Sequence, residues 1–289
     1  MSDAAIVIGE CVKPSALNKL NKIISSYPKV IVAFSGGVDS TLLLRLCCDI
    51  LGRRNVVAIT GVSQTYTEEE KTAATRFART LGVRHVLLET DELTCSEFAE
   101  NPGNRCYYCK QELFNKMAGL ASKQGIPAIL DATNADDLTD YRPGRQAAEE
   151  LGVISPFVLA GFSKKDIRHL SKKLGLLSWD KPANPCLASR VPYGTRITEE
   201  ILEKIHAGEK FVRDLGFPVV RLRHHDELAR IEIPVEDFPR VLKRGTLQKI
   251  AAHLKSLGYL WITLDIEGYR TGSLNRSLTR PARPSKAGP

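Results

Sequence analysis

The sequence predicts an α/β fold, in which a parallel β-sheet carries helices on both faces and a smaller C-terminal α+β domain follows. Over residues 15–175, short apolar runs rich in β-branched residues alternate with segments of helical periodicity, which is typical of a parallel sheet. Prolines interrupt this pattern between residues 178 and 194 and indicate a boundary. Beyond it, two strand-like runs follow each other directly, as in a hairpin.

The first domain is expected to contain four strands and the helices that connect them. The predicted strands are residues 30–34, 56–60, 85–89 and 128–131. The predicted helices are residues 15–26, 40–51, 67–81 and 106–124, a helix that closes at residues 147–151, and residues 164–174. Local signals set helix boundaries: Thr67 and Glu70 form a capping box, and Gly82 ends the same helix.

The second domain is expected to be an α-β-β-α-β unit. Its predicted elements are a helix at residues 199–215, strands at 219–223 and 229–233, a helix at 236–257 and a strand at 259–266. His224 and His225 are placed in the polar turn between the first two strands. The predicted boundaries are 1–180 for the sheet domain, 181–196 for a cysteine-bearing linker, 197–274 for a small domain that serves substrate binding or oligomerisation, and 275–289 for a basic disordered tail.

Composition and charge narrow the classes of function. With 43% hydrophobic and 26% charged residues, this chain of 289 residues has the composition of a soluble globular protein. No apolar stretch approaches the roughly 20 residues of a membrane helix, and no basic region of a signal peptide is present, so we expect a cytoplasmic protein without a membrane partner. The net charge of +8 includes four basic residues in the acid-free tail, so nucleic acid is a disfavoured partner of the remainder.

A glycine-containing turn follows the first predicted strand and opens the next helix; its residues are Ser35, Gly36, Gly37, Val38, Asp39 and Ser40. The two glycines allow the backbone to approach a ligand closely. The first N–H groups of the helix then point at one spot, at the positive end of the helix dipole, which favours phosphate. The turn lacks the lysine of a Walker A loop and the three spaced glycines of a dinucleotide fingerprint. The alternative is a tight turn in which Asp39 and Ser40 only cap the helix.

The same six residues resemble the PP-loop of the ATP pyrophosphatase superfamily, whose domains are Rossmann-like. The resemblance implies that ATP is cleaved between its α and β phosphates, that AMP is transferred to an acceptor, and that pyrophosphate is released. It also implies that Asp39 acts in catalysis. The residues implied to hold the nucleotide are Ser35, Gly36, Gly37, Asp39 and Ser40.

A second polar segment, residues 131–137, ends the fourth predicted strand. Ligands of parallel sheets bind at the C-terminal ends of the strands, where the glycine turn, Thr60 and this segment are all expected to lie. Carboxylate oxygens are ligands that Mg²⁺ takes, so Asp39 and Asp136 are the predicted magnesium or pyrophosphate-side groups. Thr60 is a predicted nucleotide contact. The alternative for the segment is an Asx-rich turn.

Seven cysteines occur in a chain without a secretion signal, which disfavours a disulfide framework and favours metal or catalytic use where they cluster. Cys106 and Cys109 are three residues apart on a predicted helix and share a face. Cys186 is the natural third thiol, and three nearby cations would favour its thiolate: Lys181, Arg190 and Arg196. Three thiolates without an obvious fourth ligand suit a 4Fe-4S cluster with one open iron better than structural zinc. A redox pair and separate buried cysteines remain alternatives.

Three segments narrow the resemblance to the LarE family of ATP-dependent sulfur transferases. They are Arg105-Cys106-Tyr107-Tyr108-Cys109-Lys110, Asp140-Tyr141-Arg142-Pro143-Gly144, and a run from Trp179-Asp180-Lys181-Pro182 through Cys186-Leu187-Ala188-Ser189-Arg190 to Pro192-Tyr193-Gly194. The likeness covers about residues 15–270, in order. It implies adenylation of pyridinium-3,5-biscarboxylic acid mononucleotide and its conversion to a thiocarboxylate, in biosynthesis of the nickel-pincer nucleotide cofactor of lactate racemase.

Two sulfur sources are known in that family. In one branch a single cysteine, matching Cys186, gives up its sulfur and ends as dehydroalanine. In the other, three cysteines hold a 4Fe-4S cluster whose open iron carries an extra sulfide. Because Cys106, Cys109 and Cys186 fill all three positions, this chain resembles the second branch. The resemblance implies these three as metal ligands and Cys186 as a catalytic residue.

Charged residues of the second domain are candidates for substrate binding. Arg190, Arg221 and Arg223 are expected to bind the phosphate and carboxylates of an anionic nucleotide through bidentate hydrogen bonds, with Arg190 also acting in catalysis. Arg221 and Arg223 alternate along one predicted strand and so share a face. Glu232 is a candidate substrate-site base or arginine partner, whereas Glu209 is expected to be a surface carboxylate. The alternative for the two strand arginines is solvated charge.

Other functions share parts of this pattern. A tRNA thiolase also joins a PP-loop to cysteines, but the C-terminal domain offers little aromatic surface for RNA. Amide-forming enzymes such as NAD synthetases share the glycine turn and have no need of the three cysteines. A non-catalytic nucleotide-binding iron-sulfur carrier is a further alternative. Beyond the anionic nucleotide, the expected partners are further copies of this chain and a sulfur donor protein.

Overall fold

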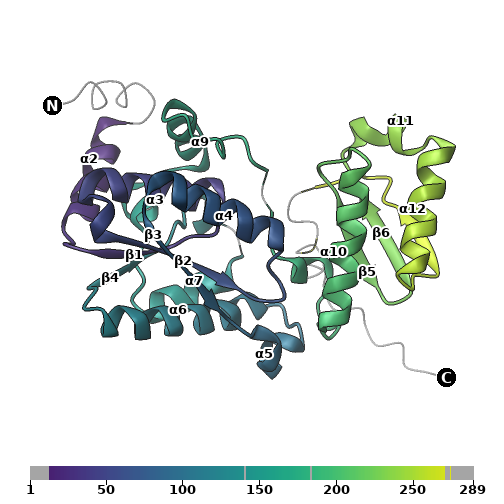
Figure 1. The fold of residues 1–289 in the computed structure, drawn as a ribbon, viewed down its shortest axis with the longest axis horizontal. Coiled ribbons are helices and arrows are strands. Elements are labelled where there is room, and N and C mark those ends of the chain that lie inside the picture. Colours follow the sequence, from purple (N-terminus) through teal and green to yellow (C-terminus); the bar gives the residue numbers. More distant parts are fainter. Residues whose placement is uncertain (1–12, 140, 183, 271–273, 275–289) are drawn as a thin grey trace. The chain divides into compact units, whose positions relative to one another are not determined.

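The computed structural model describes residues 13–139, 141–182, 184–270 and 274. The chain divides into two compact units (Figure 1). Unit 1 comprises the described residues of Met1–Phe98 and Asn104–Asn184, and unit 2 those of Ala99–Gly103 and Pro185–Pro289. Cys11, Asp140 and the predicted basic tail at 275–289 lie outside the described residues. No helix in the described part of the chain is both long enough and apolar enough to span a membrane.

Unit 1 is built on a parallel sheet. Its strands are β1 (Val30–Ala33), β2 (Val56–Val62), β3 (Arg84–Glu89) and β4 (Ala128–Leu130), in the order β3-β2-β1-β4. Every pairing is parallel, and Val30 lies opposite both Val56 and Ala128. The predicted parallel sheet is confirmed, and each strand lies where an apolar run predicted it.

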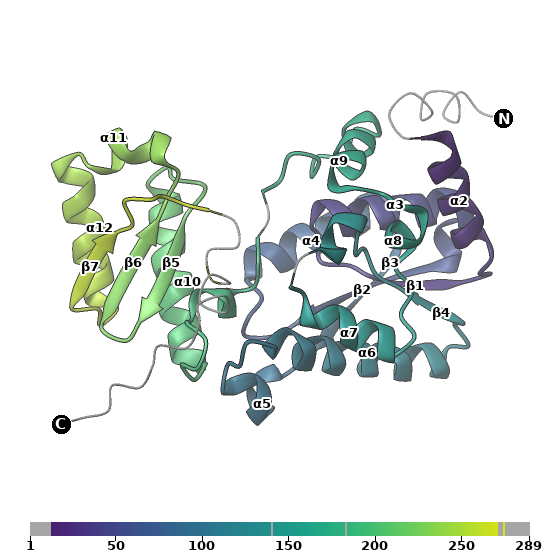
Figure 2. The same cartoon turned by 180° about the vertical axis from the view of Figure 1, so that it is seen from behind.

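Helices cover both faces of this sheet, as predicted (Figures 1 and 2). One face packs against α2 (Pro14–Ser25), α3 (Val38–Leu51), α4 (Glu68–Leu81), α8 (Pro156–Ala160) and α9 (Lys164–Lys173). The other face packs against α6 (Arg105–Lys123) and α7 (Pro143–Glu150). Successive side chains of a strand face opposite ways, so Val30 and Val32 enter the first core and Ile31 enters the second. Strands buried on both faces are therefore apolar throughout.

A glycine permits close contact between α6 and α7. A Cβ atom added at Gly144 would lie 3.0 Å from the carbonyl oxygen of Cys106 and 2.8 Å from Cγ of Lys110. Any side chain at this position would push α7 away from the backbone that carries the cysteine pair. Gly144 belongs to one of the segments that the sequence singled out, and its role here is steric.

Unit 2 contains a mixed sheet and its own helices. Its elements are η4 (Leu187–Arg190), α10 (Glu199–Asp214), β5 (Arg221–His225), β6 (Leu228–Glu232), α11 (Phe238–Val241), α12 (Arg244–Ser256) and β7 (Trp261–Leu264). Strands β5 and β6 are antiparallel, and β6 and β7 are parallel. Asp226 turns the hairpin with a φ of 53°, a left-handed conformation that aspartate tolerates. The predicted small α+β region is confirmed.

Two details of unit 2 differ from the sequence prediction. The single helix expected at 236–257 is wrong, because Lys243 adopts an extended backbone (φ −59°, ψ 130°) that separates α11 from α12. His224 does not lie in the turn. It is buried on β5, and its Nδ1 lies 3.1 Å from the hydroxyl of Tyr259. Burial lowers the pKa of His224, which favours the neutral ring.

A short segment from the first half of the chain belongs to unit 2. Asn101 is fully buried and has a left-handed φ of 56°. Its side-chain amide donates to the carbonyl oxygens of Pro192, at 2.6 Å, and Thr195, at 3.0 Å. In return the N–H of Gly194 donates to the carbonyl of Asn101 at 2.9 Å. Residues 99–103 therefore fix the stretch that follows Cys186.

Candidate functional site

The glycine turn joins β1 to α3 and closes on itself. The hydroxyl of Ser40 lies 3.1 Å from that of Ser35 and accepts the N–H of Ser35 at 3.3 Å. Gly36 has a φ of +70°, a conformation that L side chains rarely adopt. Gly37 is the N-cap of α3 and has no side chain to engage the first N–H groups. These N–H groups therefore lie beside a tight backbone turn, as an anion site requires.

Asp39 reaches toward neighbouring segments rather than capping α3. Its carboxylate forms an ion pair with the ammonium of Lys164 and accepts a 3.4 Å hydrogen bond from the amide of Asn134. Lys164 is the first residue of α9, and its backbone N–H donates to Asp136 at 2.8 Å. The structure thus joins two predicted residues, Asp39 and Asp136, through a lysine that sequence reasoning missed. The capping box that begins α9 at Ser163 was the available signal.

The polar segment after β4 holds two kinds of carboxylate: Asp137 stabilises the local turn, and the exposed Asp136 is available to bind a ligand. Asn134 and Asp137 form a reciprocal capping box around the 3-10 turn that follows β4. Burial raises the pKa of Asp137, against the opposing effect of its hydrogen bond from Asn134. Among the described residues, no three His, Cys, Asp or Glu side chains group as a metal centre. Mg²⁺ keeps several waters and needs one or two carboxylates, so the oxygen donors of Asp39 and Asp136 fit it chemically.

Two side chains support the glycine turn from neighbouring segments. The hydroxyl of Thr60 donates to the carbonyl of Phe34 at 2.6 Å, and Nε2 of His85 lies 2.8 Å from the same hydroxyl. Because Thr60 uses its proton on Phe34, His85 supplies the proton of the second bond. Burial lowers the pKa of His85, which favours the neutral ring. Thr60 is predicted to contact the nucleotide, but it is buried, and its hydroxyl is already bonded to Phe34 and His85. The second supporting side chain is Tyr66, whose hydroxyl donates to the carbonyl of Ser35 at 3.1 Å.

The stretch between α9 and Cys186 is fastened to unit 1 at the glycine turn. Lys181 donates from Nζ to the carbonyl of Gly36 at 3.3 Å. Arg168 of α9 donates to the carbonyls of Trp179, at 2.8 Å, and Lys181, at 3.0 Å. Sequence reasoning took Lys181 as a cation that favours the Cys186 thiolate. The structure places its ammonium group at the glycine turn.

The described cysteines are all free thiols. Cys106 and Cys109 lie in the first two turns of α6, with Cys106 exposed and Cys109 half-buried. The thiol of Cys109 donates to Glu92 at 3.4 Å, and the hydroxyl of Thr90 donates to the same carboxylate oxygen at 3.1 Å. The pair belongs to unit 1, whereas Cys186 belongs to unit 2. Thiolates are the usual ligands of iron-sulfur clusters, so the donor type fits the predicted cluster.

Arg190 holds the backbone at Cys186. Its guanidinium forms two hydrogen bonds to Glu209, at 2.8 and 2.9 Å, and a third to the carbonyl of Cys186 at 3.0 Å. Arg190 and Glu209 are each 1% exposed. Burial alone would raise the pKa of Glu209, but Arg190 outweighs this effect and holds the pKa below its usual range. The expected surface position of Glu209 is therefore wrong. The geometry gives Arg190 a positioning role, and its catalytic role stays a prediction.

The two arginines of β5 are buried. Arg223 forms two hydrogen bonds to Glu232, at 2.9 and 2.8 Å, and donates to the carbonyl of Ser189 at 2.8 Å. The guanidinium of Arg221 lies 5.2 Å from the centre of the Tyr269 ring. Burial lowers the pKa of Arg221. The alternative that these arginines are solvated charges is wrong, and Glu232 is an arginine partner.

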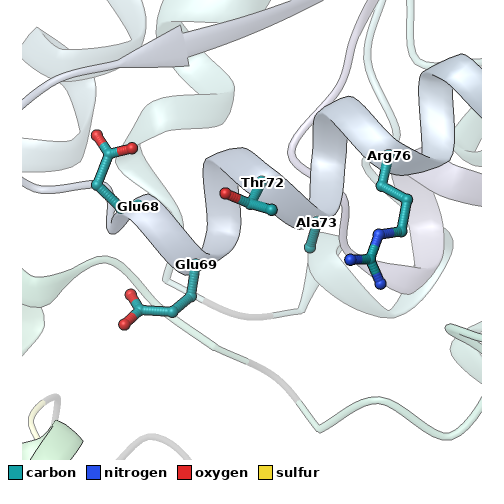
Figure 3. A pocket seen from close by; sticks show the side chains of 5 residues that line it. All are labelled: Glu68, Glu69, Thr72, Ala73 and Arg76. Atoms are coloured by element: carbon teal, nitrogen blue, oxygen red, sulfur yellow. The ribbon is translucent and has the colours of Figure 1, made fainter.

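A shallow hollow lies on the surface of α4 (Figure 3). It is lined by Glu68, Glu69, Thr72, Ala73 and Arg76. Its walls come from one helix, and none of the predicted site residues lines it. We therefore place the candidate site at the glycine turn and not in this hollow.

The parallel sheet, the glycine turn and the groups gathered beside it define a nucleotide-binding domain of the PP-loop class. A family model described as NAD synthase matches residues 15–105. This range contains β1, the glycine turn and α3, and it ends just before Cys106. The match covers the nucleotide-binding part of unit 1. A narrower relationship has to account for Cys106, Cys109 and Cys186 and for most of unit 2.

Whole-length relatives supply that relationship. The chain is 39% identical over 252 residues to pyridinium-3,5-bisthiocarboxylic acid mononucleotide synthase of Lactiplantibacillus plantarum, covering 87% of this chain and 91% of the relative. It is 43% identical over 266 residues to an uncharacterized protein of Synechocystis sp., covering 92% and 99%. It is 30% identical over 243 residues to an uncharacterized protein of Methanocaldococcus jannaschii, covering 84% and 91%. The chain belongs to the LarE family, that of the first of these relatives, as its motifs predicted.

Proposed function

We propose that this protein is an ATP-dependent sulfur transferase of nickel-pincer nucleotide cofactor biosynthesis. It adenylates a carboxylate of pyridinium-3,5-biscarboxylic acid mononucleotide and then exchanges the AMP for sulfur. The observation that carries the proposal is the glycine turn, with Asp39, Asp136 and Lys164 drawn together beside it. It lies in a chain 39% identical to a synthase of the corresponding bisthiocarboxylic acid.

In the adenylation step, ATP binds with its phosphates at the N-terminus of α3. A substrate carboxylate oxygen attacks the α-phosphorus, the bond to the bridging oxygen breaks, and pyrophosphate leaves with the electron pair. Lys164 places positive charge where the leaving group gains negative charge, which lowers the barrier. Asp39 and Asp136 are the carboxylates proposed to hold Mg²⁺, which when bound would neutralise phosphate charge.

In the sulfur step, Cys106, Cys109 and Cys186 are proposed to act together. Their thiolates fit a 4Fe-4S cluster, which when bound would supply a sulfide for the activated carboxylate. Arg190 fixes the carbonyl of Cys186, so the backbone that presents this thiol is held in one conformation. The alternative sulfur source is Cys186 itself, which would then be consumed in a single turnover.

Arg221 and Arg223 are proposed to bind the anionic groups of the substrate. A guanidinium in a dry environment attracts an anion more strongly than one in water. Glu232 fixes the orientation of the Arg223 guanidinium through two hydrogen bonds, which reduces the entropy lost when an anion binds beside it. Arg223 also contacts the carbonyl of Ser189, three residues beyond Cys186, so the proposed substrate contact and the cysteine loop are parts of one network.

Pyrophosphate release tests the adenylation step. Protein purified without oxygen and supplied with Mg²⁺ and ATP is expected to release pyrophosphate only with the biscarboxylate mononucleotide. Transfer RNA, deamido-NAD with ammonia, and buffer alone serve as the other acceptor arms. Release with tRNA alone would indicate a thiolase, release with deamido-NAD a synthetase of the amide-forming kind, and no release in any arm a nucleotide-binding carrier.

Iron and acid-labile sulfide assays test the source of sulfur. The wild type is expected to hold iron, and Cys106→Ala is expected to lose it. Cys95→Ala is the matched control, because Cys95 is a partly exposed thiol of the same unit outside the proposed ligand set. An iron-free wild type that makes one thiocarboxylate per chain would contradict the cluster and indicate the sacrificial route.

A further inference from the structure

Residues 179–182, which we call the strap, lie between α9 and the loop that carries Cys186. Arg168 of α9 donates to the carbonyls of Trp179, at 2.8 Å, and Lys181, at 3.0 Å. The ammonium of Lys172, also on α9, lies 4.5 Å from the centre of the Trp179 ring, a cation–π distance. The backbone of the strap is therefore tied to the same helix whose first residue lies at the glycine turn.

The ammonium group of Lys181 lies at this turn with a weak partner. Its Nζ donates to the carbonyl of Gly36 at 3.3 Å, and within the described ranges no carboxylate pairs with it. Gly36 directly precedes Gly37, the N-cap of α3, so this cation lies at the positive end of a helix dipole. A cation is disfavoured there and an anion is favoured. A phosphate group at the turn would convert this unfavourable position into a favourable one.

Lys164 is in a different electrostatic state. Its ammonium is already neutralised by Asp39, whereas that of Lys181 is bonded to an uncharged carbonyl. Both lysines reach the same turn, one from the start of α9 and one from the strap. A triphosphate carries several negative charges, more than Lys164 alone would offset. Besides Mg²⁺, Lys181 offers a second positive charge at this turn that no carboxylate in the described part of the chain offsets.

We propose that Lys181 binds the β- or γ-phosphate of ATP, exchanging the carbonyl of Gly36 for a phosphate oxygen. This inference rests on the proposed function, because it takes ATP as the ligand of the turn. Lys181 lies five residues before Cys186, so the same contact restrains the chain that leads to the sulfur-bearing cysteine. AMP lacks these phosphates. The strap is therefore held while ATP is intact and released once pyrophosphate has left, which orders adenylation before sulfur transfer.

Calorimetric titration of the full chain tests the contact. The ligands are AMP and the Mg²⁺ complex of α,β-methylene-ATP, whose α–β linkage is not cleaved. Lys181→Met is expected to weaken binding of the ATP analogue about tenfold to a hundredfold, because a charge-assisted hydrogen bond is lost, and to leave AMP binding unchanged. Lys165→Met is the matched control, since Lys165 is exposed and neighbours Lys164. Thermal melting checks that both variants remain folded.

Hydrogen exchange measured by mass spectrometry tests the restraint. In the wild type, the analogue is expected to slow amide exchange over residues 176–182 more than AMP does. In Lys181→Met at saturating analogue, this difference is expected to disappear. If the analogue protects residues 176–182 in Lys181→Met as strongly as in the wild type, the proposed restraint of the strap is wrong. If Lys181→Met binds the analogue as tightly as the wild type does, the proposed contact between Lys181 and phosphate is wrong.

Binding of AMP and of the analogue by the wild type distinguishes a failure of this inference from a failure of the proposed function. If the wild type binds AMP as tightly as the analogue, or binds neither, the ATP site itself is wrong and both proposals fail. If the wild type prefers the analogue and Lys181→Met keeps that preference, only the assignment of Lys181 fails.

Discussion

Replacing Glu209 with glutamine would leave the Arg190 guanidinium buried without its carboxylate. The pair is joined by two hydrogen bonds, at 2.8 and 2.9 Å, and both residues are 1% exposed. Removing one partner of a buried ion pair costs about 3–5 kcal/mol, because the remaining charge is not compensated. Glutamine keeps the shape of the side chain and can still accept the N–H of Leu222, now bonded at 3.0 Å. We therefore expect Glu209→Gln to lower the free energy of unfolding of unit 2 by about 3–5 kcal/mol.

Hydrogen exchange of the amides in β5 and β6, measured in the full chain, reports this free energy for unit 2. Glu200→Gln is the matched control on the same helix: its carboxylate pairs with Lys204 at the surface, so its replacement is expected to cost far less stability than that of Glu209. Combining Arg190→Met with Glu209→Leu is expected to recover most of the stability, since neither charge of this pair is then left buried without its partner. A loss below about 1 kcal/mol for Glu209→Gln would show that Glu209 does not compensate the buried charge of Arg190.

The pair also predicts a pH dependence. The folded state holds the pKa of Glu209 below its usual range, whereas the unfolded chain does not. The stabilisation is therefore fully present above the usual pKa and is lost as the pH falls through the lower, folded value. The difference in stability between wild type and Glu209→Gln should narrow in acid. A difference that is independent of pH would contradict the assigned charge state.

Three further variants test other contacts. Gly144→Ala is expected to lower the free energy of unfolding by about 1–3 kcal/mol in urea, because its Cβ would meet the backbone of α6. Gly119→Ala is the control, because Gly119 lies on the exposed side of α6 with open space around the added Cβ, and it should raise the free energy of unfolding by about 0.5–1 kcal/mol. Equal effects of the two variants would contradict the close contact between α6 and α7. Lys164→Met should slow pyrophosphate release about a hundredfold in steady-state assays while Lys165→Met leaves it unchanged, and matching rates would remove Lys164 from the site. Thr60→Val should cost about 1–3 kcal/mol of stability yet retain ATP binding by calorimetry, whereas lost binding in a stable variant would return Thr60 to the nucleotide site.

The sheet of unit 1 was predictable from sequence because β1, β4 and most of β2 are buried on both faces, whereas the edge strand β3 is partly exposed. The buried strands are short apolar runs bounded by turn residues, as in the run that precedes Ser35. The glycine turn was predictable for a related reason, since its backbone conformation requires glycine at position 36. Local chemistry decides both features, so a single sequence suffices to find them.

Contacts between distant segments were not predictable in the same way. A glutamate on an amphipathic helix is expected at the surface, so the sequence places Glu209 there. Nothing local shows that Glu209 will be buried in an ion pair with an arginine 19 residues earlier. Lys164 and Lys181 reach the glycine turn only because the chain, far along the sequence, returns to this turn at the start of α9 and again after it. Asn101 joins unit 2 through hydrogen bonds to carbonyls more than 90 residues away.

The break between α11 and α12 has a subtler origin. Residues 236–257 carry helical periodicity on both sides of Lys243, and no proline follows to mark the interruption. Gly245, near the start of α12, was the weak local signal, since glycine lowers helix propensity. The domain boundaries, further copies of the chain, a sulfur donor protein and a cytoplasmic location stay predictions.

Nucleotide cleavage at the glycine turn is proposed to drive sulfur transfer to the substrate. The most direct measurement is mass spectrometry of the products after oxygen-free incubation with Mg²⁺, ATP and the biscarboxylate mononucleotide. This coupling predicts a mononucleotide in which sulfur replaces a carboxylate oxygen, formed together with AMP and absent with Cys186→Ala or with α,β-methylene-ATP. Thiocarboxylate that forms with the uncleavable analogue, or AMP that accumulates while the wild type transfers no sulfur, would contradict it.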